Sequence, residues 1–294
     1  MTNEEYIEKL IRRHAERIAK EEIRTEHEEK ISSDQPLNDH GKDNLLEKFA
    51  FSGVARILGD EWGRKVHERV INKYGRFAPF KDYGITYNNK TKKVQGSNTF
   101  YVGAVNEMIR PFNIRTATQA DLEKILRNKI LDLRKHYEDS SLVWKSNEDP
   151  NKYLAQDIYN QFNAKKGTNL KDGIPHIFPL YCMNLREDSN SNYGLAFDLL
   201  DGFESFEAPI LNQPSQLKFD ESDIDEATGF PRQVKKEGSR TLYTIHSGLC
   251  GAFLSGRLDS VSYDGWLSSL DADGWVVCIA AQAADFEKLE DSLK

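Results

Sequence analysis

The sequence predicts an α+β fold with an N-terminal helical region. Apolar residues recur at helical spacing among many charged residues up to about residue 76. From about residue 77, aromatic and β-branched residues lie between turn signals, and short apolar runs at close spacing follow residue 174. A chain of 294 residues is long enough for one or two domains with a sizeable core. We therefore expect a helical region over 1–76 and an α+β domain over 77–294.

The N-terminal region is expected to contain three helices. The first, 4–30, carries a thin apolar stripe on a charged rod, and a linker with turn residues covers 32–43. Helices over 44–58 and 60–74 follow. The stripe predicts packing either on these later helices, which we favour, or against another copy of the chain; it consists of Tyr6, Ile7, Leu10, Ile11, Ile18 and Ile23.

The middle of the chain predicts strands over 83–90 and 98–104, followed by a helix. Thr118, with Asp121 three residues later, is a typical N-cap for a helix that runs to about Arg134. The charged stretch 139–172 is expected to be an insertion with one helix over 152–162.

The last third of the chain is expected to be rich in strands. Asp201-Gly202 between two apolar runs indicates a hairpin, and the acidic stretch 220–228 indicates an exposed loop. Residues 282–294 are expected to form a short helix or tail. The predicted strands are 177–186, 193–200, 203–211, 240–245 and 275–281.

One segment has an unusual composition. Between Gly238 and Ala281 there is no Lys, Glu, Gln or Met, although Lys (24), Glu (24) and Gln (9) make up 57 of the 294 residues. A random draw of the same length misses Lys, Glu and Gln about once in ten thousand trials. Burial explains the strand-like ends of the segment but not its polar middle, 250–273. Randomising the two adenines of an Asn codon yields every amino acid except Lys, Glu, Gln, Met and Trp, which matches the gap.

Because of this segment, the chain resembles the archaeal variable proteins of diversity-generating retroelements. In these elements, error-prone reverse transcription changes adenine positions near the 3′ end of the gene. The ordered matches are 192–197, 208–211, 223–229, 240–244, 247–249 and 273–277, with Trp275 standing where the group has Arg. Residues 114–123 are similar to the strand-to-helix motif of C-type lectin folds of the sulfatase-modifying type. The resemblance implies a C-type lectin-like domain that displays a variable region at about 247–275 and binds ligands without catalysing a reaction.

Contact residues are expected at positions whose side chains point to solvent, while Leu254, Leu258, Leu267 and Leu270 hold the backbone in the core. Arg257 and Tyr263 are the expected energetic anchors, because aromatic and Arg side chains dominate binding hot spots. Trp266 is assigned to the framework, since adenine changes in an Asn codon do not produce Trp. The candidate ligand-binding residues are Cys250, Gly251, Phe253, Ser255, Arg257, Asp259, Ser260, Ser262, Tyr263 and Asp271.

The sequence gives less support to the hypotheses that the protein is an enzyme or binds a metal ion. The stretch 248–252 has a Cys where a nucleophile elbow has Ser, but its second Gly is missing and no His follows it. Residues 271–274 resemble part of a calcium loop, yet the twelfth position would be Ala280, which has no carboxylate. We expect no cofactor and no metal. The alternatives are a small-molecule or sugar-modifying enzyme of related fold, and a structural or assembly protein that associates through its N-terminal helix.

The net charge and the cysteine content limit which binding partners and which cellular compartment we expect. A net charge of −7 argues against a nucleic-acid partner, and no run of 18 apolar residues predicts insertion into a membrane. The N-terminus lacks the pattern of a signal peptide, which predicts a cytoplasmic protein, with surface or virion display left open. Cys182 and Cys278 are expected to be reduced and buried. The expected ligand is a protein or cell-surface molecule, and the oligomeric state stays open.

Overall fold

The computed structural model describes residues 51–81, 84–171, 173–269 and 272–294. The chain divides into two compact units, Met1–Asp43 and Asn44–Lys294, and every described residue belongs to the second. The helix predicted over 4–30, the linker 32–43 and the first residues of the helix predicted over 44–58 lie outside the described residues. The helix expected at 60–74, which we assigned to the N-terminal region, belongs to the second unit.

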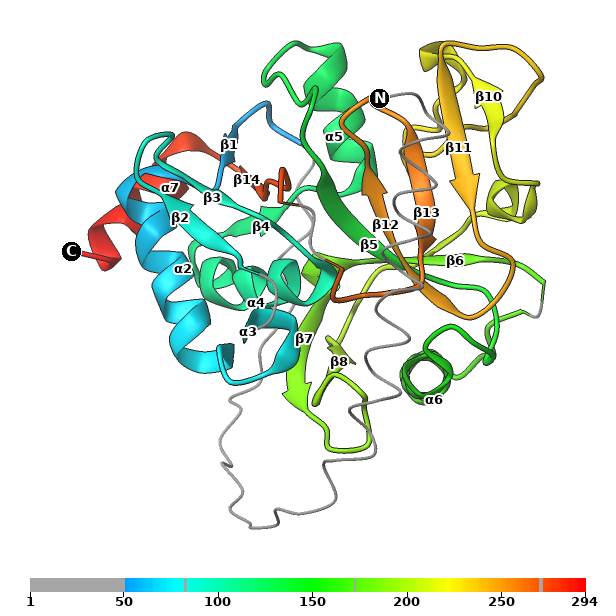
Figure 1. Ribbon diagram of the computed structural model, residues 1–294, viewed down its shortest axis with the longest axis horizontal. Helices are drawn as coiled ribbons and strands as arrows, with labels where there is room; N and C mark the ends of the chain where they lie inside the picture. The colour runs from blue at the N-terminus through cyan, green and yellow to red at the C-terminus, as the bar shows by residue number, and fades with distance from the viewer. Residues whose placement is uncertain (1–50, 82–83, 172, 270–271) are drawn as a thin grey trace. The chain divides into compact units, whose positions relative to one another are not determined.

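The largest sheet has seven strands and carries the part of the chain with the unusual composition (Figure 1). Adjacent strands of this sheet are antiparallel to each other, except that β11 and β13 are parallel. In spatial order the strands are β10 (Leu217–Phe219), β11 (Arg240–Thr244), β13 (Ser260–Asp264), β12 (Leu249–Leu254), β5 (Glu138–Trp144), β6 (His176–Pro179) and β9 (Phe206–Glu207).

Three smaller sheets complete the strands of the described residues. Their pairs are all antiparallel. They consist of β1 (Ala55–Ile57), β14 (Val277–Ala280) and β4 (Ile114–Thr116), of β2 (Thr86–Asn88) with β3 (Lys93–Gln95), and of β7 (Met183–Glu187) with β8 (Leu195–Leu199). Helices combined with mixed and antiparallel sheets confirm the α+β class.

In Figure 1, α2, α4 and α7 gather around the β1–β14–β4 sheet, and α6 lies beside β8 and the seven-stranded sheet. The helices are α2 (Asp60–Tyr74), α3 (Ala78–Lys81), α4 (Thr99–Ile109), α5 (Gln119–Arg127), α6 (Lys152–Lys166) and α7 (Ala283–Ser292). Single 3-10 turns occur at η1 (Arg110–Phe112), η2 (Leu180–Cys182), η3 (Pro209–Asn212) and η4 (Glu221–Asp223).

Four helix predictions are confirmed. α2 has the predicted bounds, α6 covers and extends the predicted 152–162, and α7 forms the expected C-terminal helix. α5 begins with the predicted cap: the Thr118 hydroxyl accepts a hydrogen bond from the Asp121 amide at 3.2 Å, and the Asp121 carboxylate accepts one from the Thr118 amide at 2.8 Å. This helix ends at Arg127, well before the predicted Arg134.

The strand predicted over 98–104 is wrong, because these residues start α4. The Asn98 side chain caps this helix by accepting a hydrogen bond from the Tyr101 amide at 2.8 Å. Phe100, Tyr101 and Val102 are all fully buried. Nine of the eleven α4 residues are buried, so the sequence lacks the clear period of an amphipathic helix and is easily taken for a buried strand.

Three further predictions need correction. Residues 55–57, expected in a helix, form β1. The stretch 139–172 is not simply an insertion, because β5 is an interior strand of the seven-stranded sheet, between β12 and β6. Asp201-Gly202 does not close a hairpin, since β8 pairs with β7 and β9 pairs with β6.

The seven-stranded sheet separates two hydrophobic clusters. Leu142, Phe178 and Leu249 face the larger cluster with α2, α4 and α7, while Val143 and Leu242 face a smaller cluster with the loops around β10. A third cluster packs α5 against Leu254 and Leu258. Leu254, Leu258 and Leu267 are buried as predicted, and Leu270 lies outside the described residues. Cys182 and Cys278 are buried free thiols, as predicted.

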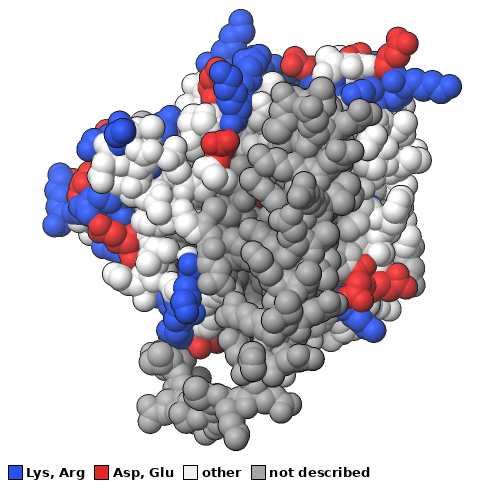
Figure 2. Space-filling model, in the orientation of Figure 1, with Lys and Arg blue, Asp and Glu red and all other residues white. Residues whose placement is uncertain are grey.

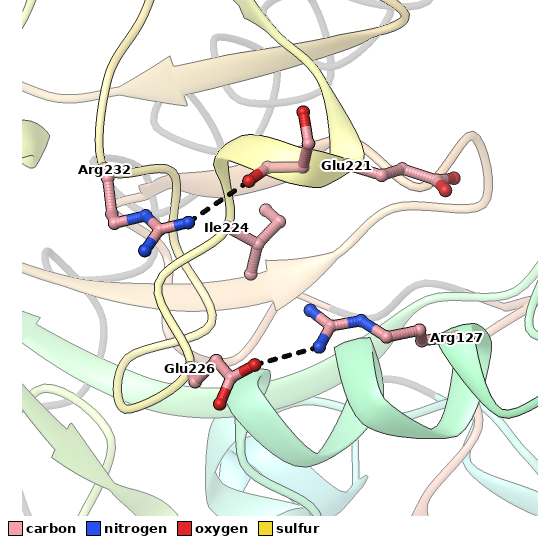
Figure 3. A pocket seen from close by; sticks show the side chains of 6 residues that line it. Arg127, Glu221, Ile224, Glu226 and Arg232 are labelled. Atoms are coloured by element: carbon pink, nitrogen blue, oxygen red, sulfur yellow. Dashed lines mark hydrogen bonds and ion pairs between the residues drawn. The ribbon is translucent and has the colours of Figure 1, made fainter.

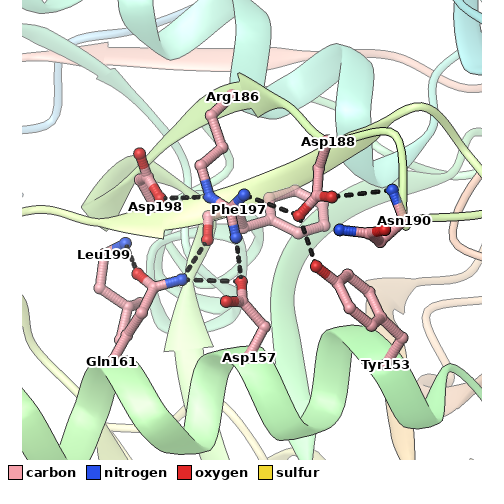
Figure 4. Close-up of polar contacts among 9 residues, drawn as sticks. All are labelled: Tyr153, Asp157, Gln161, Arg186, Asp188, Asn190, Phe197, Asp198 and Leu199. Carbon is pink, nitrogen blue, oxygen red and sulfur yellow. Dashed lines mark hydrogen bonds and ion pairs between the residues drawn. The ribbon is translucent and has the colours of Figure 1, made fainter.

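A polar network attaches α6 to the β7–β8 pair (Figure 4). The Arg186 guanidinium on β7 lies 2.8 Å from Asp157 of α6, 2.7 Å from Asp188 and 2.8 Å from Asp198 of β8. Gln161 of α6 adds a hydrogen bond of 2.7 Å to the Phe197 carbonyl. The N–H groups of a planar guanidinium point in fixed directions. Charge-assisted hydrogen bonds from one guanidinium therefore define the orientation of α6 relative to the β7–β8 pair.

Candidate functional site

The segment that lacks Lys, Glu, Gln and Met forms β12 and β13 at the centre of the seven-stranded sheet. We interpreted the polar middle, 250–273, as a loop, and this interpretation is wrong for the residues of that stretch that belong to β12 and β13. These two strands are antiparallel to each other, and on their other edges they pair with β5 and β11, which both lie outside the expected variable region 247–275. The backbone of the segment is thus held on both sides by hydrogen bonds that do not depend on side chains.

Register places residues of four strands in two rows on opposite faces of the sheet, because directly paired residues share a face and successive residues alternate. We call the first row the outer row; it consists of Asp139, Phe253, Val261 and Tyr243. We call the second the inner row; it consists of Glu138, Leu254, Ser260 and Leu242. All inner-row residues are buried. In the outer row Val261 is also buried, at 7% exposed, whereas Asp139, Phe253 and Tyr243 are half-buried.

Three candidate contact residues point into the protein and not to solvent. Cys250, Ser260 and Ser262 are each 0% exposed, so the expectation that they contact a ligand from an exposed position is wrong. The Cys250 thiol donates to the Ser262 carbonyl at 3.3 Å, within the cluster that also holds Val143 and Phe219. Strand alternation explains the error. In a strand, every second side chain points into the protein, and this pattern is not expected for a segment that is interpreted as a loop.

Two other candidates, Ser255 and Asp259, are also buried, because their polar groups hold the β12–β13 loop together. The Ser255 amide donates to the Asp259 carbonyl at 3.0 Å, and the Asp259 amide donates to the Ser255 hydroxyl at 3.1 Å. The Asp259 carboxylate accepts a hydrogen bond from the Thr241 amide at 2.7 Å, and burial raises the pKa of this carboxyl. Solvent exposure was therefore wrongly predicted for both residues.

The remaining candidates lie in different environments. Arg257 is exposed at the tip of the β12–β13 loop, as expected for a contact residue, and Phe253 is half-buried in the outer row. Gly251 is buried opposite Leu142 of β5. Tyr263 belongs to β13 by its backbone, and Asp271 lies outside the described residues.

The outer row includes residues that sequence reasoning missed. Phe253 packs on Tyr137, with ring centroids 5.9 Å apart, and the Ser97 hydroxyl donates to the Asp139 carboxylate. Val261 and Tyr243 complete the row, and burial raises the pKa of Tyr243. The alternation of apolar and polar types in 260–263 was the available signal for Val261. Nothing in the sequence brings Asp139 and Tyr243, more than a hundred residues apart, to the two sides of β12 and β13.

Trp275 borders this region in a stack with the His136 ring and the Lys93 ammonium. The His136 ring is nearly parallel to the indole, and the Lys93 ammonium lies 3.9 Å from the Trp275 ring centroid. Desolvation by burial lowers the pKa of His136, against its hydrogen bond to the Asp273 carbonyl at 3.1 Å. An indole between two such groups is a rigid, amphipathic rim of the kind that binding surfaces use.

The structure can be compared with the hypotheses of a nucleophile elbow and of a metal site. Cys250 lies in a regular strand and not at a strand-to-helix turn, so the stretch 248–252 is not a nucleophile elbow. Burial raises the pKa of the other two thiols, to about 11 at Cys182. Among the residues that the structure describes, no three His, Cys, Asp or Glu side chains gather where they could hold a metal ion.

Surface charge is mixed on the face seen in Figure 2, where Lys and Arg side chains lie beside Asp and Glu side chains. On α2, for example, Arg64 pairs with Glu61 at 2.5 Å and also with Glu68. Within the described ranges, no helix is both long enough and apolar enough to cross a membrane. The charged residues that the structure describes on this face are of both signs, so they give no support for binding driven by a field of one sign.

Comparison with known proteins gives no match: no family model, no curated protein and no solved structure matches the chain.

Proposed function

We propose that this protein binds ligands through a diversified surface built on β12, β13 and the loops beside them, within a C-type lectin-like fold. The ligand is a protein or a cell-surface molecule. Its identity is set by codons between about 247 and 275 that adenine-directed mutagenesis rewrites. According to this proposal, the protein binds its ligand and does not catalyse a reaction.

The observation that carries the proposal is that burial does not account for the missing residue types. β5, the neighbour of β12, is as deeply buried, yet it contains Glu138 and is followed by the buried Lys145. This sheet therefore tolerates Glu and Lys. The missing types are also absent from exposed positions within 247–275, where the chain has residues such as Arg257 and Asp273 instead. A bias in the codons explains both environments, whereas exclusion of charge from a core explains only one.

The sheet also supplies what a diversified surface requires. Every strand next to β12 and β13 comes from outside the segment 247–275, and the buried Leu254, Leu258 and Leu267 anchor the segment in the core. A change at an outer-row position leaves these anchors and the backbone hydrogen bonds intact. Loss of a Leu anchor would cost about 2–5 kcal/mol, so variation is compatible with folding only between the anchors.

The first test is deep sequencing of the 3′ end of the gene and its downstream flank in the source population. We expect substitutions confined to codons between about 247 and 275, at positions that are adenines in a nearby repeat. An invariant segment without such a repeat would refute diversification.

A binding experiment tests the second half of the proposal. Natural variants that differ only within 247–275 are displayed on phage and selected against surface proteins of co-resident organisms. We expect different variants to enrich on different targets. Enrichment that is identical for all variants would place binding elsewhere on the chain.

A further inference from the structure

A pocket of about 350 Å³ lies at the C-terminal end of α5, beside the loop that follows β10 (Figure 3). Its floor residue, Ile224, belongs to the same buried cluster as Leu242 of the inner row. The pocket is thus on the opposite side of the sheet from the outer row, and no residue of 247–275 lines it. The lining residues are Arg127, Glu221, Ser222, Ile224, Glu226 and Arg232.

Two guanidinium groups from separate elements face this pocket. Figure 3 shows the groups of Arg127, from α5, and Arg232, from the loop, on two sides of Ile224. The carboxylate of Glu221 extends away from them, which leaves Glu226 as the carboxylate among the two arginines. Ile224 is 3% exposed and supplies an apolar floor between the charges.

The interactions that hold these arginines are easily exchanged. Arg127 pairs with Glu226 at 3.1 Å, but their side chains are 51% and 72% exposed, and exposed ion pairs contribute little. Arg232 donates one hydrogen bond of 3.2 Å to the Ser222 carbonyl. A guanidinium has five N–H donors in a planar fork, so each arginine can also donate to a ligand.

We propose that this pocket binds a compact oxyanion, a phosphate or carboxylate group, on a small organic molecule whose apolar part packs on Ile224. The planar forks of Arg127 and Arg232 match the oxygens of such a group, and their positions allow one anion to be held from two sides. Glu226 competes for Arg127, so the bound ligand takes the place of this carboxylate. The volume is that of a small-ligand site.

The test is a calorimetric titration of the full chain with phenyl phosphate, benzoate and inorganic phosphate at low salt. We expect saturable binding of at least one aromatic oxyanion that weakens with added salt. Arg127→Ala and Arg232→Ala should each weaken it about tenfold or more. Glu226→Gln should tighten it, because the competing carboxylate is removed. Preference for phenyl phosphate or benzoate identifies the oxyanion, and weaker inorganic phosphate binding reports the contact with Ile224.

Arg134→Ala is the matched control. Arg134 is an exposed arginine paired with Asp132 at 3.4 Å, and it does not line the pocket. Its loss should leave the affinity unchanged, and circular dichroism confirms that every variant is folded. Absence of saturable binding by all three compounds, or equal loss in Arg134→Ala, overturns the proposal. Since none of these residues lies in 247–275, the result is independent of the diversified surface.

Discussion

Ser262 and Arg257 belong to the same Lys-free segment but lie in opposite environments. Ser262 is fully buried and its hydroxyl has no hydrogen-bond partner, while Arg257 is exposed at a loop tip. We predict that Ser262→Asp lowers the free energy of unfolding by at least about 3 kcal/mol, because it buries an unpaired charge. Arg257→Asp should stay within about 1 kcal/mol of the wild type. Urea unfolding of both variants measures this, and equal effects would contradict the assignment of faces.

Glu138, in the inner row, is a buried carboxyl without a partner. It is 2% exposed, and neither oxygen has a hydrogen-bond partner. Desolvation raises its pKa well above the ordinary value of 4.5, and the nearby Asp139 raises it further. The folded protein therefore keeps this carboxyl protonated at pH values where the unfolded chain has released the proton.

A raised pKa fixes the sign of the pH effect. The contribution of protonated Glu138 to stability is fully present below about pH 4.5 and is lost as pH rises through the folded-state pKa. Glu138→Gln cannot ionise, so we predict that its free energy of unfolding relative to wild type increases by about 1 kcal/mol or more between pH 4.5 and pH 8. Urea unfolding at the two pH values tests this. A difference that is the same at both would show that Glu138 titrates alike in the folded and unfolded chain.

At the scale of elements, Arg186 joins α6 to the β7–β8 pair through three carboxylates (Figure 4). Its side chain is 31% exposed, so solvent reduces the strength of these pairs only in part. We predict that Arg186→Ala lowers the free energy of unfolding by about 1–2 kcal/mol. Arg76→Ala is the matched control: Arg76 pairs with Glu187 of the same β7 strand, but both side chains are 61% exposed. Its effect should stay below about 1 kcal/mol, and a loss equal to that of Arg186→Ala would argue against the network.

Elements that depend on neighbouring residues could be predicted from the sequence, and those that depend on distant ones could not. Thr118 and Asp121 cap α5 through contacts three residues apart, so their pattern is visible in the chain. α4 packs against α2, β7 and β4, and its mostly apolar sequence does not show that it is a helix enclosed by these elements. β5 likewise obtains its central place from pairing with β12, more than a hundred residues later.

The candidate site was predictable as a segment but not as a surface. Composition identified 238–281, and the buried Leu254, Leu258 and Leu267 were correctly assigned to the framework. The sequence did not indicate that strands on both sides of the segment impose a period of two on its side chains. For that reason the buried Cys250 and Ser262 were placed among the contacts.

At the scale of the molecule, the seven-stranded sheet lies between the outer row and the second hydrophobic cluster. Phe253 and Tyr243 of the outer row are half-buried, so changes there alter a surface, while changes on the other face of β12 and β13 alter a core that includes Leu242 and Phe219. Mutagenesis that acts on codons does not distinguish the two faces. Folding does, because overpacking or burial of a charge in a core costs several kcal/mol of a stability that is only about 5–15 kcal/mol in total.

This asymmetry predicts a pattern in the natural variants. If the segment is diversified, functional copies should vary freely at Phe253 and Arg257, but at Cys250, Ser260 and Ser262 they should keep small, uncharged residues. The measurement compares sequences from the source population with an unselected library made by randomising the same codons. Equal diversity on both faces in the natural set would show that the buried positions accept any residue. A period of two in the natural set, absent from the library, would show that the sheet filters the variation that the gene receives.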